Sequence, residues 1–134
     1  MAPRTLTLRE LNRATLARQL LLARTTQSVP EVIEQLVGLQ AQQASAPYVG
    51  LWTRLQNFGR DDLAQRIEQR EVVKATLMRS TLHLVTAADY LRLRATVQPV
   101  LTAAWEAIFK ELKGNFAVEQ LLTVARPFIA EQPR

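Results

Sequence analysis

Two glutamines stand two residues apart in the stretch 38–55, which reads GLQAQQASAPYVGLWTRL. Side chains two residues apart point to the same side of an extended chain, whereas in a helix they lie about 200° apart. An extended segment would therefore direct the carboxamides of Gln40 and Gln42 to one side and Ala41 to the other. A carboxamide cannot act as a general base, but it can position water and present its oxygen to developing positive charge. This pair is the first candidate for a chemical site.

A structural role competes with the chemical one for this pair. The two carboxamides could bond to backbone groups and tie neighbouring helices together, and residue type alone favours this interpretation. Gln43 lies off the shared face and is predicted to be polar surface. His83, the single histidine, has no carboxylate within its strand, so a packed or hairpin-orienting role is favoured over acid–base catalysis.

Two predicted helices hold the glutamine segment between them. The first, residues 29–37, begins with the capping box Ser28-x-x-Glu31 and is expected to end at Gly38, which suits the left-handed conformation. The second, residues 46–57, is expected to start with Ser45 as its cap and a proline in its first turn. A short connector between helices, here with a strand at 39–42, can direct side chains at a ligand while its scaffold stays rigid.

The remaining elements complete a recognisable order. A helix over 7–24 precedes, with a capping box at Thr7, and another helix over 61–70 follows. Period-two patterns then predict a hairpin that returns near residue 81, with Thr81 and His83 on one face. Helix, short strand, two helices and a hairpin is the order of a winged helix-turn-helix. The predicted fold class is mainly α, a winged helix with a small β-hairpin wing and flanking helices.

The domain prediction divides the chain near Pro99. Residues 1–98 are predicted to form an amino-terminal winged-helix domain with its core at 29–85. A proline inside a helix removes a hydrogen bond, so Pro99 is expected to kink or restart the helix that contains it. Residues 99–134 are predicted as a linker helix and the first helix of a truncated domain, which makes the chain a fragment. Its exposed aromatic residues, expected at Trp105, Phe109 and Phe116, would favour self-association.

Charge and composition narrow the class of partner. The net charge is +5, and residues 1–24 hold five arginines against the single acidic Glu10. The planar guanidinium of arginine binds phosphate well, so a basic face of this kind favours nucleic acid, here double-stranded DNA, as the partner. A solvated arginine-rich surface explains the charge equally well. The side chains predicted to contact DNA are Arg9, Arg13, Arg66, Arg70, Arg79, Thr81 and His83.

Composition also bears on compartment and cofactors. With no cysteine and one histidine, neither a thiolate nor a histidine-rich metal site can form, and no metal or cofactor is expected. No run reaches the roughly 18 apolar residues of a membrane span, and no signal peptide is evident. The sequence predicts a cytoplasmic protein without a membrane partner.

Several motifs of the chain together resemble the AlkZ-like family of bacterial winged-helix DNA-binding proteins. They are LNRA at 11–14, ARQLLL at 17–22, VGLQAQ at 37–42, PYV at 47–49, LWTRL at 51–55 and LMRSTLHLVT at 77–86. The family includes glycosylases that release alkylated purines and unhook interstrand crosslinks. Its members look longer, with tandem winged helices and a β-barrel, so the resemblance implies an amino-terminal module whose carboxy-terminal domains are missing.

The resemblance also assigns roles to residues. The family's catalytic signature is glutamine, an apolar residue, then glutamine or aspartate, so by resemblance Gln40 and Gln42 are the catalytic pair. Residues 78–82 would match the hairpin that approaches the duplex. A purine alkylated at N7 is already cationic and leaves with little protonation, so carboxamides that position water and stabilise the oxocarbenium-like state would suffice.

The predicted function is therefore the DNA-binding module of a DNA repair glycosylase, a hydrolase of N-glycosidic bonds. Its substrates would be N7-alkylated purines or interstrand crosslinks in duplex DNA, and the fragment alone would be inactive. One alternative is a non-catalytic winged-helix DNA-binding or transcription-regulatory protein. Another is an interaction domain that binds no nucleic acid.

Overall fold

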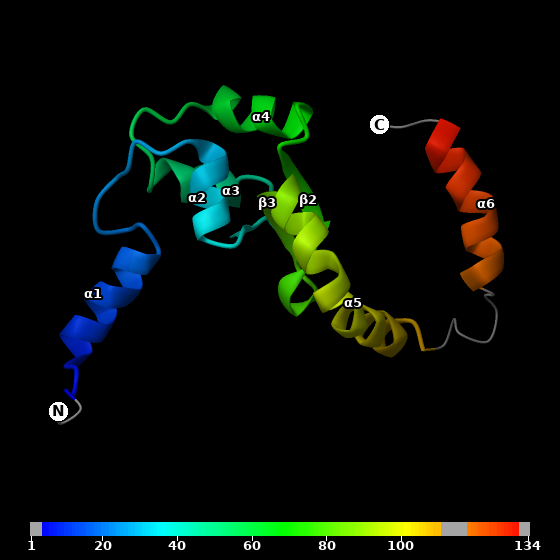
Figure 1. Cartoon of the computed structure of the whole chain (residues 1–134), viewed down its shortest axis with the longest axis horizontal. Coiled ribbons are helices and arrows are strands. Elements are labelled where there is room, and N and C mark those ends of the chain that lie inside the picture. The colour runs from blue at the N-terminus through cyan, green and yellow to red at the C-terminus, as the bar shows by residue number, and fades with distance from the viewer. Residues whose placement is uncertain (1–3, 111–117, 132–134) are drawn as a thin grey trace. The chain divides into compact units, whose positions relative to one another are not determined.

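The computed structural model describes residues 4–110 and 118–131, which form helices and one small sheet (Figure 1). The elements are α1 (Leu8–Arg18), α2 (Val29–Gln35), β1 (Leu39–Gln40), α3 (Ala46–Trp52), α4 (Arg60–Glu68), β2 (Val72–Thr76), the 3-10 turn η1 (Met78–Ser80), β3 (Leu82–Thr86), α5 (Ala87–Ile108) and α6 (Val118–Glu131). The protein is mainly α, and the order from α2 to β3 is that of a winged helix, with β2 and β3 as the wing. The predicted fold class is confirmed.

The chain divides into two compact units, Met1–Leu101 and Thr102–Arg134. The first unit contains the winged helix, α1 and the start of α5. The second contains the end of α5 and α6. Phe116, one of the aromatic residues predicted to be exposed, falls outside the described residues, whereas Trp105 and Phe109 are 40% and 39% exposed.

Capping boxes begin α1 and α2 where the sequence predicts them. The Thr7 hydroxyl accepts a hydrogen bond from the Glu10 amide at 3.3 Å, and the Glu10 carboxylate accepts one from the Thr7 amide at 2.9 Å. Ser28 and Glu31 make the same reciprocal pair at the start of α2. Each box satisfies backbone N–H groups that have no partner within the helix. The start of each helix therefore follows from four residues of local sequence.

The ends of the helices differ from the prediction. The first helix stops at Arg18 rather than near residue 24, and Leu20 then adopts a left-handed φ of 54°. The second stops at Gln35, and the left-handed position belongs to Val37, with φ 60°. Gly38 has φ 123°, and a β-carbon there would lie 2.8 Å from the Val85 side chain. The glycine is thus required by a close approach to the sheet as well as by its backbone angle.

The later helices also depart from expectation. The third ends at Trp52 and not at residue 57, and Ser45 precedes it with helical backbone angles and makes no side-chain cap bond. The sequence predicts a kink or a restart at Pro99. Helix α5 runs from Ala87 to Ile108 with Pro99 inside it, so the restart as a separate second helix is a wrong prediction. Proline removes only one backbone bond, and both Pro99 and Ala95, whose carbonyl loses that bond, are exposed to water.

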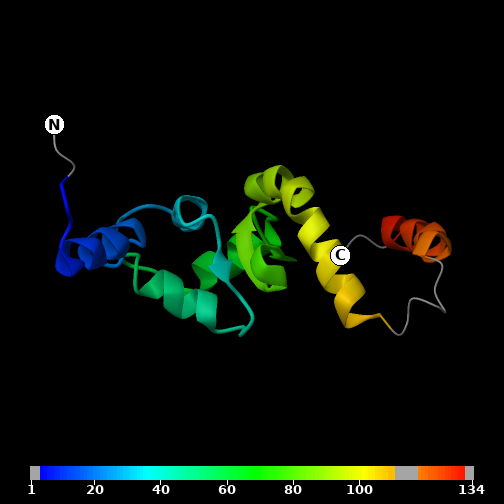
Figure 2. The ribbon, with the colours of Figure 1, turned by 90° about the horizontal axis from the view of Figure 1, so that it is seen from below.

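The three strands form an antiparallel sheet in the order β1-β3-β2. The wing pairs Val72 with Thr86 at one end and Thr76 with Leu82 at the other, which confirms the predicted hairpin. Its turn is the 3-10 segment, in which Arg79 and Ser80 both have positive φ. On the other edge, Leu39 pairs with Leu84 and Gln40 pairs with His83. Figures 1 and 2 show the sheet between α2 and α3 on one side and the start of α5 on the other.

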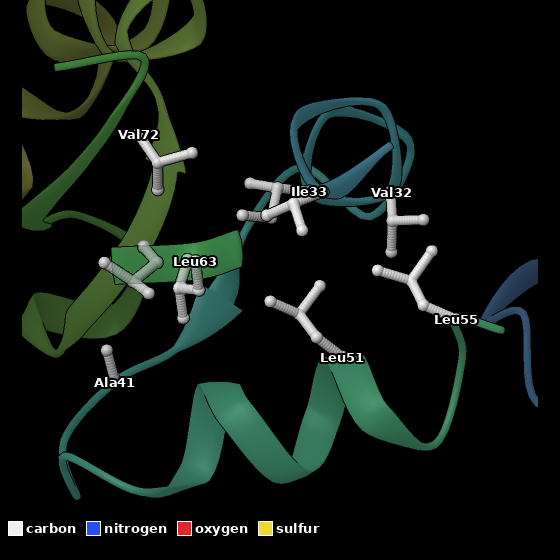
Figure 3. Packing of buried hydrophobic residues seen from close by; sticks show 9 residues of the cluster. Val32, Ile33, Ala41, Leu51, Leu55, Leu63 and Val72 are labelled. Atoms are coloured by element: carbon white, nitrogen blue, oxygen red, sulfur yellow. The ribbon is translucent and has the colours of Figure 1, made fainter. Parts of the chain in front are cut away.

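The core lies where α2, α3 and α4 meet one face of the sheet (Figure 3). Val32 and Ile33 from α2, Leu51 from α3 and Leu63 from α4 are each 0% exposed. Burying side chains of this size stabilises a fold by roughly 1.5–3 kcal/mol each. Ala41 joins this cluster at 2% exposure, so the core fixes the orientation of the glutamine segment beside it.

Candidate functional site

Residues 39–42 lie along the edge of the sheet and alternate between core and solvent. Beyond the two residues of β1, the Ala41 amide donates to the Leu82 carbonyl at 2.7 Å, which continues the pairing with β3. Gln40 is exposed, Ala41 is buried and Gln42 is exposed. Because side chains alternate along an extended chain, Gln40 leaves β1 on the side opposite to Ala41. Gln42 follows in a bend of the chain.

The two glutamines differ in what their carboxamides contact. The Oε1 atom of Gln42 accepts a hydrogen bond from the Leu82 backbone amide at 3.2 Å, across 40 residues of sequence. Among the residues that the structure describes, the Gln40 side chain has no hydrogen-bond partner. Gln42 therefore joins the segment to the wing, as the structural interpretation expects, and Gln40 presents both its oxygen and its NH₂ group to solvent.

His83 is the cross-strand neighbour of Gln40. Residues paired across antiparallel strands project their side chains from the same face of the sheet. His83 is 9% exposed as a whole residue, and its Nδ1 atom lies 2.9 Å from the Thr81 carbonyl oxygen. Thr81 itself lies just outside β3, and its hydroxyl donates to the Met78 carbonyl at 3.1 Å. The turn of the wing thus fixes the orientation of the histidine.

An open groove of about 780 Å³ lies between α3, α4 and the sheet. Ala41 lines it, as do Leu84 and Lys74, which are paired with each other on the face opposite to His83. Trp52 also lines it and is 55% exposed, with the Arg24 guanidinium 4.3 Å above its ring. Ala41 faces this groove, and neither Gln40 nor Gln42 lines it.

The predicted DNA-contacting arginines are spread over three elements. Arg9 and Arg13 are exposed one turn apart on α1, and Arg79 is exposed at the tip of the wing. Arg66 on α4 is already paired, because its guanidinium lies 2.9 Å from the Glu71 carboxylate. Arg70 follows α4 in an exposed position with φ 58°. Of these five cations, only Arg66 must leave an ion pair with a neighbouring residue before it can contact phosphate.

Arg54 is a buried cation that the sequence analysis did not single out. Its guanidinium donates to the Gln19 carbonyl at 2.8 Å and to the Gly50 carbonyl at 2.7 Å, and its side chain is almost fully buried. Burial without a carboxylate partner lowers the pKa of Arg54 below its ordinary value. The residue therefore joins the end of α1 to α3. The sequence feature that could have identified Arg54 is its place in the LWTRL motif at residues 51–55.

The described part of the chain contains neither a metal-binding cluster nor a membrane-spanning helix. No group of three or more histidine, aspartate or glutamate side chains lies close enough there to hold a metal ion. None of the helices found in residues 4–110 and 118–131 has both the length and the apolar character to cross a membrane.

Comparison with known proteins points to one family. Residues 33–134 match the family described as DNA glycosylase AlkZ-like. No curated protein matches the chain. Among solved structures, the chain is similar to the Streptomyces sahachiroi DNA glycosylase AlkZ, with 31% sequence identity and a TM-score of 0.49. That match covers 53% of this chain and 19% of the solved one, so this chain corresponds to less than a fifth of that protein.

Proposed function

Because the chain belongs to the AlkZ-like family of DNA glycosylases, we propose that it is the amino-terminal DNA-binding module of a glycosylase that acts on N7-alkylated purines or interstrand crosslinks. A protein of this family acts on DNA, which is therefore the partner. The observation that carries the finer proposal is the exposure of Gln40 and Gln42 on either side of Ala41, which the core holds in place.

Gln40 is the member of the pair that faces the reacting bond in this proposal. An oxocarbenium-like sugar carries developing positive charge, and an amide oxygen with free lone pairs can stabilise that charge or hold an attacking water. The leaving group needs little protonation, because a purine alkylated at N7 already carries a positive charge. The solvent-facing carboxamide of Gln40 suits this task, since the protein does not already occupy its oxygen.

Gln42 has a second task, which is to connect the site to the wing. Its oxygen is bonded to Leu82, but a carbonyl oxygen has two lone pairs and the NH₂ group remains available as a donor. A wing that contacts DNA through Arg79 would thereby be coupled to the position of the glutamine pair. Arg9 and Arg13 on α1, Arg66 and Arg70 around α4, and Thr81 and His83 in the wing complete the proposed contact set.

The domain arrangement is part of the same proposal. Residues 1–98 would form the amino-terminal winged-helix domain, and residues 99–134 would lead into a following domain. A site on an exposed sheet edge, as at Gln40, would admit a bulky crosslinked adduct more readily than a closed base-flipping pocket. On this basis the 134 residues alone would not complete the reaction.

The proposal is tested by mixing the full-length protein with duplex DNA that contains N7-methylguanine and measuring the free base released. The Gln40→Ala variant is expected to release base at least about 100-fold more slowly, as when a single preorganised electrostatic contact is removed. The Gln42→Ala variant should be slower as well. Gln43→Ala serves as the matched control, because Gln43 is an equally exposed glutamine next to the pair.

The alternatives give different results in the same assay. A non-catalytic DNA-binding or regulatory protein would bind the duplex in a salt-sensitive way without releasing base. The bond between Gln42 and Leu82 favours this second candidate, because it shows one glutamine already in a structural role. An interaction domain would neither bind DNA nor release base. If the wild type releases base and both alanine variants release it at the same rate, the catalytic role of the two glutamines is wrong, but the protein is still a glycosylase.

A further inference from the structure

His83 on β3 is paired with Gln40 on the neighbouring strand β1, and this placement has a chemical use. Hydrolysis of a cationic nucleoside needs a water molecule that loses a proton as it attacks the sugar. Neither glutamine can accept that proton, because carboxamides are not bases at physiological pH. Of the described side chains on the sheet face that carries Gln40, the imidazole of His83 is the one that can do so.

The protonation of the two ring nitrogens follows from their contacts. The Nδ1 atom lies 2.9 Å from the Thr81 carbonyl oxygen, and a carbonyl can only accept a hydrogen bond. Nδ1 must therefore carry a proton, and the neutral ring has its lone pair on Nε2. This tautomer is the one that a proton acceptor at Nε2 requires, and the wing turn imposes it.

The other ring nitrogen remains reachable although the ring is mostly buried. In the described part of the chain, the one buried side-chain polar atom that lacks a partner is Nη1 of Arg94. The Nε2 atom of His83 has no hydrogen bond within the protein, so it must retain contact with solvent. A ring held at one nitrogen and open to water at the other can receive a proton without moving.

We propose that His83 is a catalytic residue of this glycosylase, whose Nε2 accepts the proton of a water molecule that Gln40 helps to hold. The water oxygen forms a bond to the anomeric carbon, and the bond from that carbon to the purine nitrogen breaks. The electron pair of the broken bond neutralises the cationic base, which leaves uncharged. The proton passes to Nε2 and then to solvent. This inference rests on the proposed glycosylase function.

The tautomer can be tested on the chain without any reaction. Nitrogen-15 NMR of the chain labelled at histidine should show a protonated Nδ1 and an unprotonated Nε2 in the neutral ring. Because the sequence has one histidine, both ring-nitrogen signals belong to His83. A neutral ring protonated at Nε2 would overturn the proposal, whatever the full-length protein does.

The catalytic role is tested by a pair of variants in the full-length protein. Asparagine at position 83 keeps an N–H group in reach of the Thr81 carbonyl but has nothing at the place of Nε2, whereas glutamine extends an amide to that place. Both His83→Asn and His83→Gln should slow single-turnover base release by about 100-fold or more, which is the usual effect of losing a general base. The rates are compared at saturating enzyme, because His83 also belongs to the proposed contact set and a change in duplex affinity must not enter the measured rate.

The outcomes separate the two levels of the proposal. If His83 only fixes the wing, His83→Asn will release base at nearly the wild-type rate, and the catalytic role is wrong. If only glutamine restores the rate, His83 positions water but does not take its proton, which also overturns the inference. If the wild type releases no base, the glycosylase function fails first, and the role of His83 in hydrolysis fails with it. Circular dichroism identifies a variant that has not folded, and the other variant then decides.

Discussion

At the scale of single residues, the two glutamines of one motif have different surroundings. Gln40 faces solvent with no partner among the described residues, whereas Gln42 accepts a bond from the Leu82 amide. A motif in which both positions look alike in sequence thus divides into one residue that is free to contact a ligand and one that also joins two parts of the fold.

This difference predicts unequal effects on stability. Gln42→Ala removes one side-chain hydrogen bond and should lower the free energy of unfolding by about 1 kcal/mol. Gln40→Ala removes no bond within the protein and should change it by about 0.5 kcal/mol or less. Urea denaturation of the chain measures both values. Equal losses in the two variants would show that the Gln42–Leu82 bond contributes nothing in solution.

The burial of Ala41 between two exposed glutamines could be predicted from sequence, and the bond of Gln42 could not. Alternation of side chains depends only on local extended geometry, so residues 40 to 42 are sufficient. The bond depends on the register of β3, which is set 40 residues further along the chain. The same limit applies to His83, whose neighbour Gln40 is known only once β1 is placed beside β3.

At the scale of elements, the starts of the helices are more predictable than their ends. The capping boxes of α1 and α2 are local and are recognised from four residues each. The ends depend on tertiary contacts, as where Gly38 must pass close to Val85. The stripe of Tyr48, Leu51 and Trp52 has helical spacing, but Trp52 faces the groove rather than the core. Periodicity gives the element and does not show which neighbours will cover each side of it.

The capping box of α2 predicts a dependence of stability on pH. Hydrogen bonds first from the backbone amide of Ser28 and then from its hydroxyl hold the pKa of Glu31 below its usual value of 4.5. A carboxylate whose pKa is lower in the folded state stabilises the fold above the unfolded pKa, and this stabilisation is lost as the pH falls through the folded pKa. The free energy of unfolding should therefore decline below about pH 4.5.

The variant Glu31→Gln should flatten that decline, because an amide cannot lose its cap by protonation. Thermal unfolding of the wild type and the variant, measured from pH 6 down to about pH 3, tests this expectation. Glu68→Gln is the matched control, since Glu68 is an exposed glutamate at the end of α4 and does not cap a helix start. If both variants follow the wild-type curve, the box does not titrate with folding.

At the scale of the whole molecule, charge and family support the same proposed partner. The net charge of +5 favours a polyanion, and the family acts on DNA. Composition alone could not have separated DNA binding from a solvated basic surface, because it does not show which cations are already paired. The structure makes that distinction for Arg66, which is paired with Glu71, and for Arg54, whose guanidinium is bonded to backbone carbonyls.

These pairings predict which arginines govern the salt dependence of DNA binding. Replacing both Arg9 and Arg13 with glutamine should reduce the slope of log affinity against log salt concentration by up to about 1.8, or about 0.9 for each phosphate that is no longer neutralised. Arg66→Gln should change the slope less, because its charge is already compensated by Glu71. Fluorescence anisotropy of a labelled duplex at several salt concentrations measures the slopes. An unchanged slope in the double variant would remove α1 from the DNA-binding surface.

Side chains alternate between core and solvent at the sheet edge formed by Gln40 and Ala41. The proposed site therefore depends on whether the segment gains or loses an odd or an even number of residues. Deleting Leu39, the one residue between Gly38 and Gln40, would exchange inside and outside, so that an amide entered the core and the methyl group of Ala41 faced solvent. Deleting two residues of the segment would restore the alternation, but Gln40 would then no longer be paired with His83. A one-residue change in length at this point is therefore expected to remove the proposed glutamine site while the winged helix is kept.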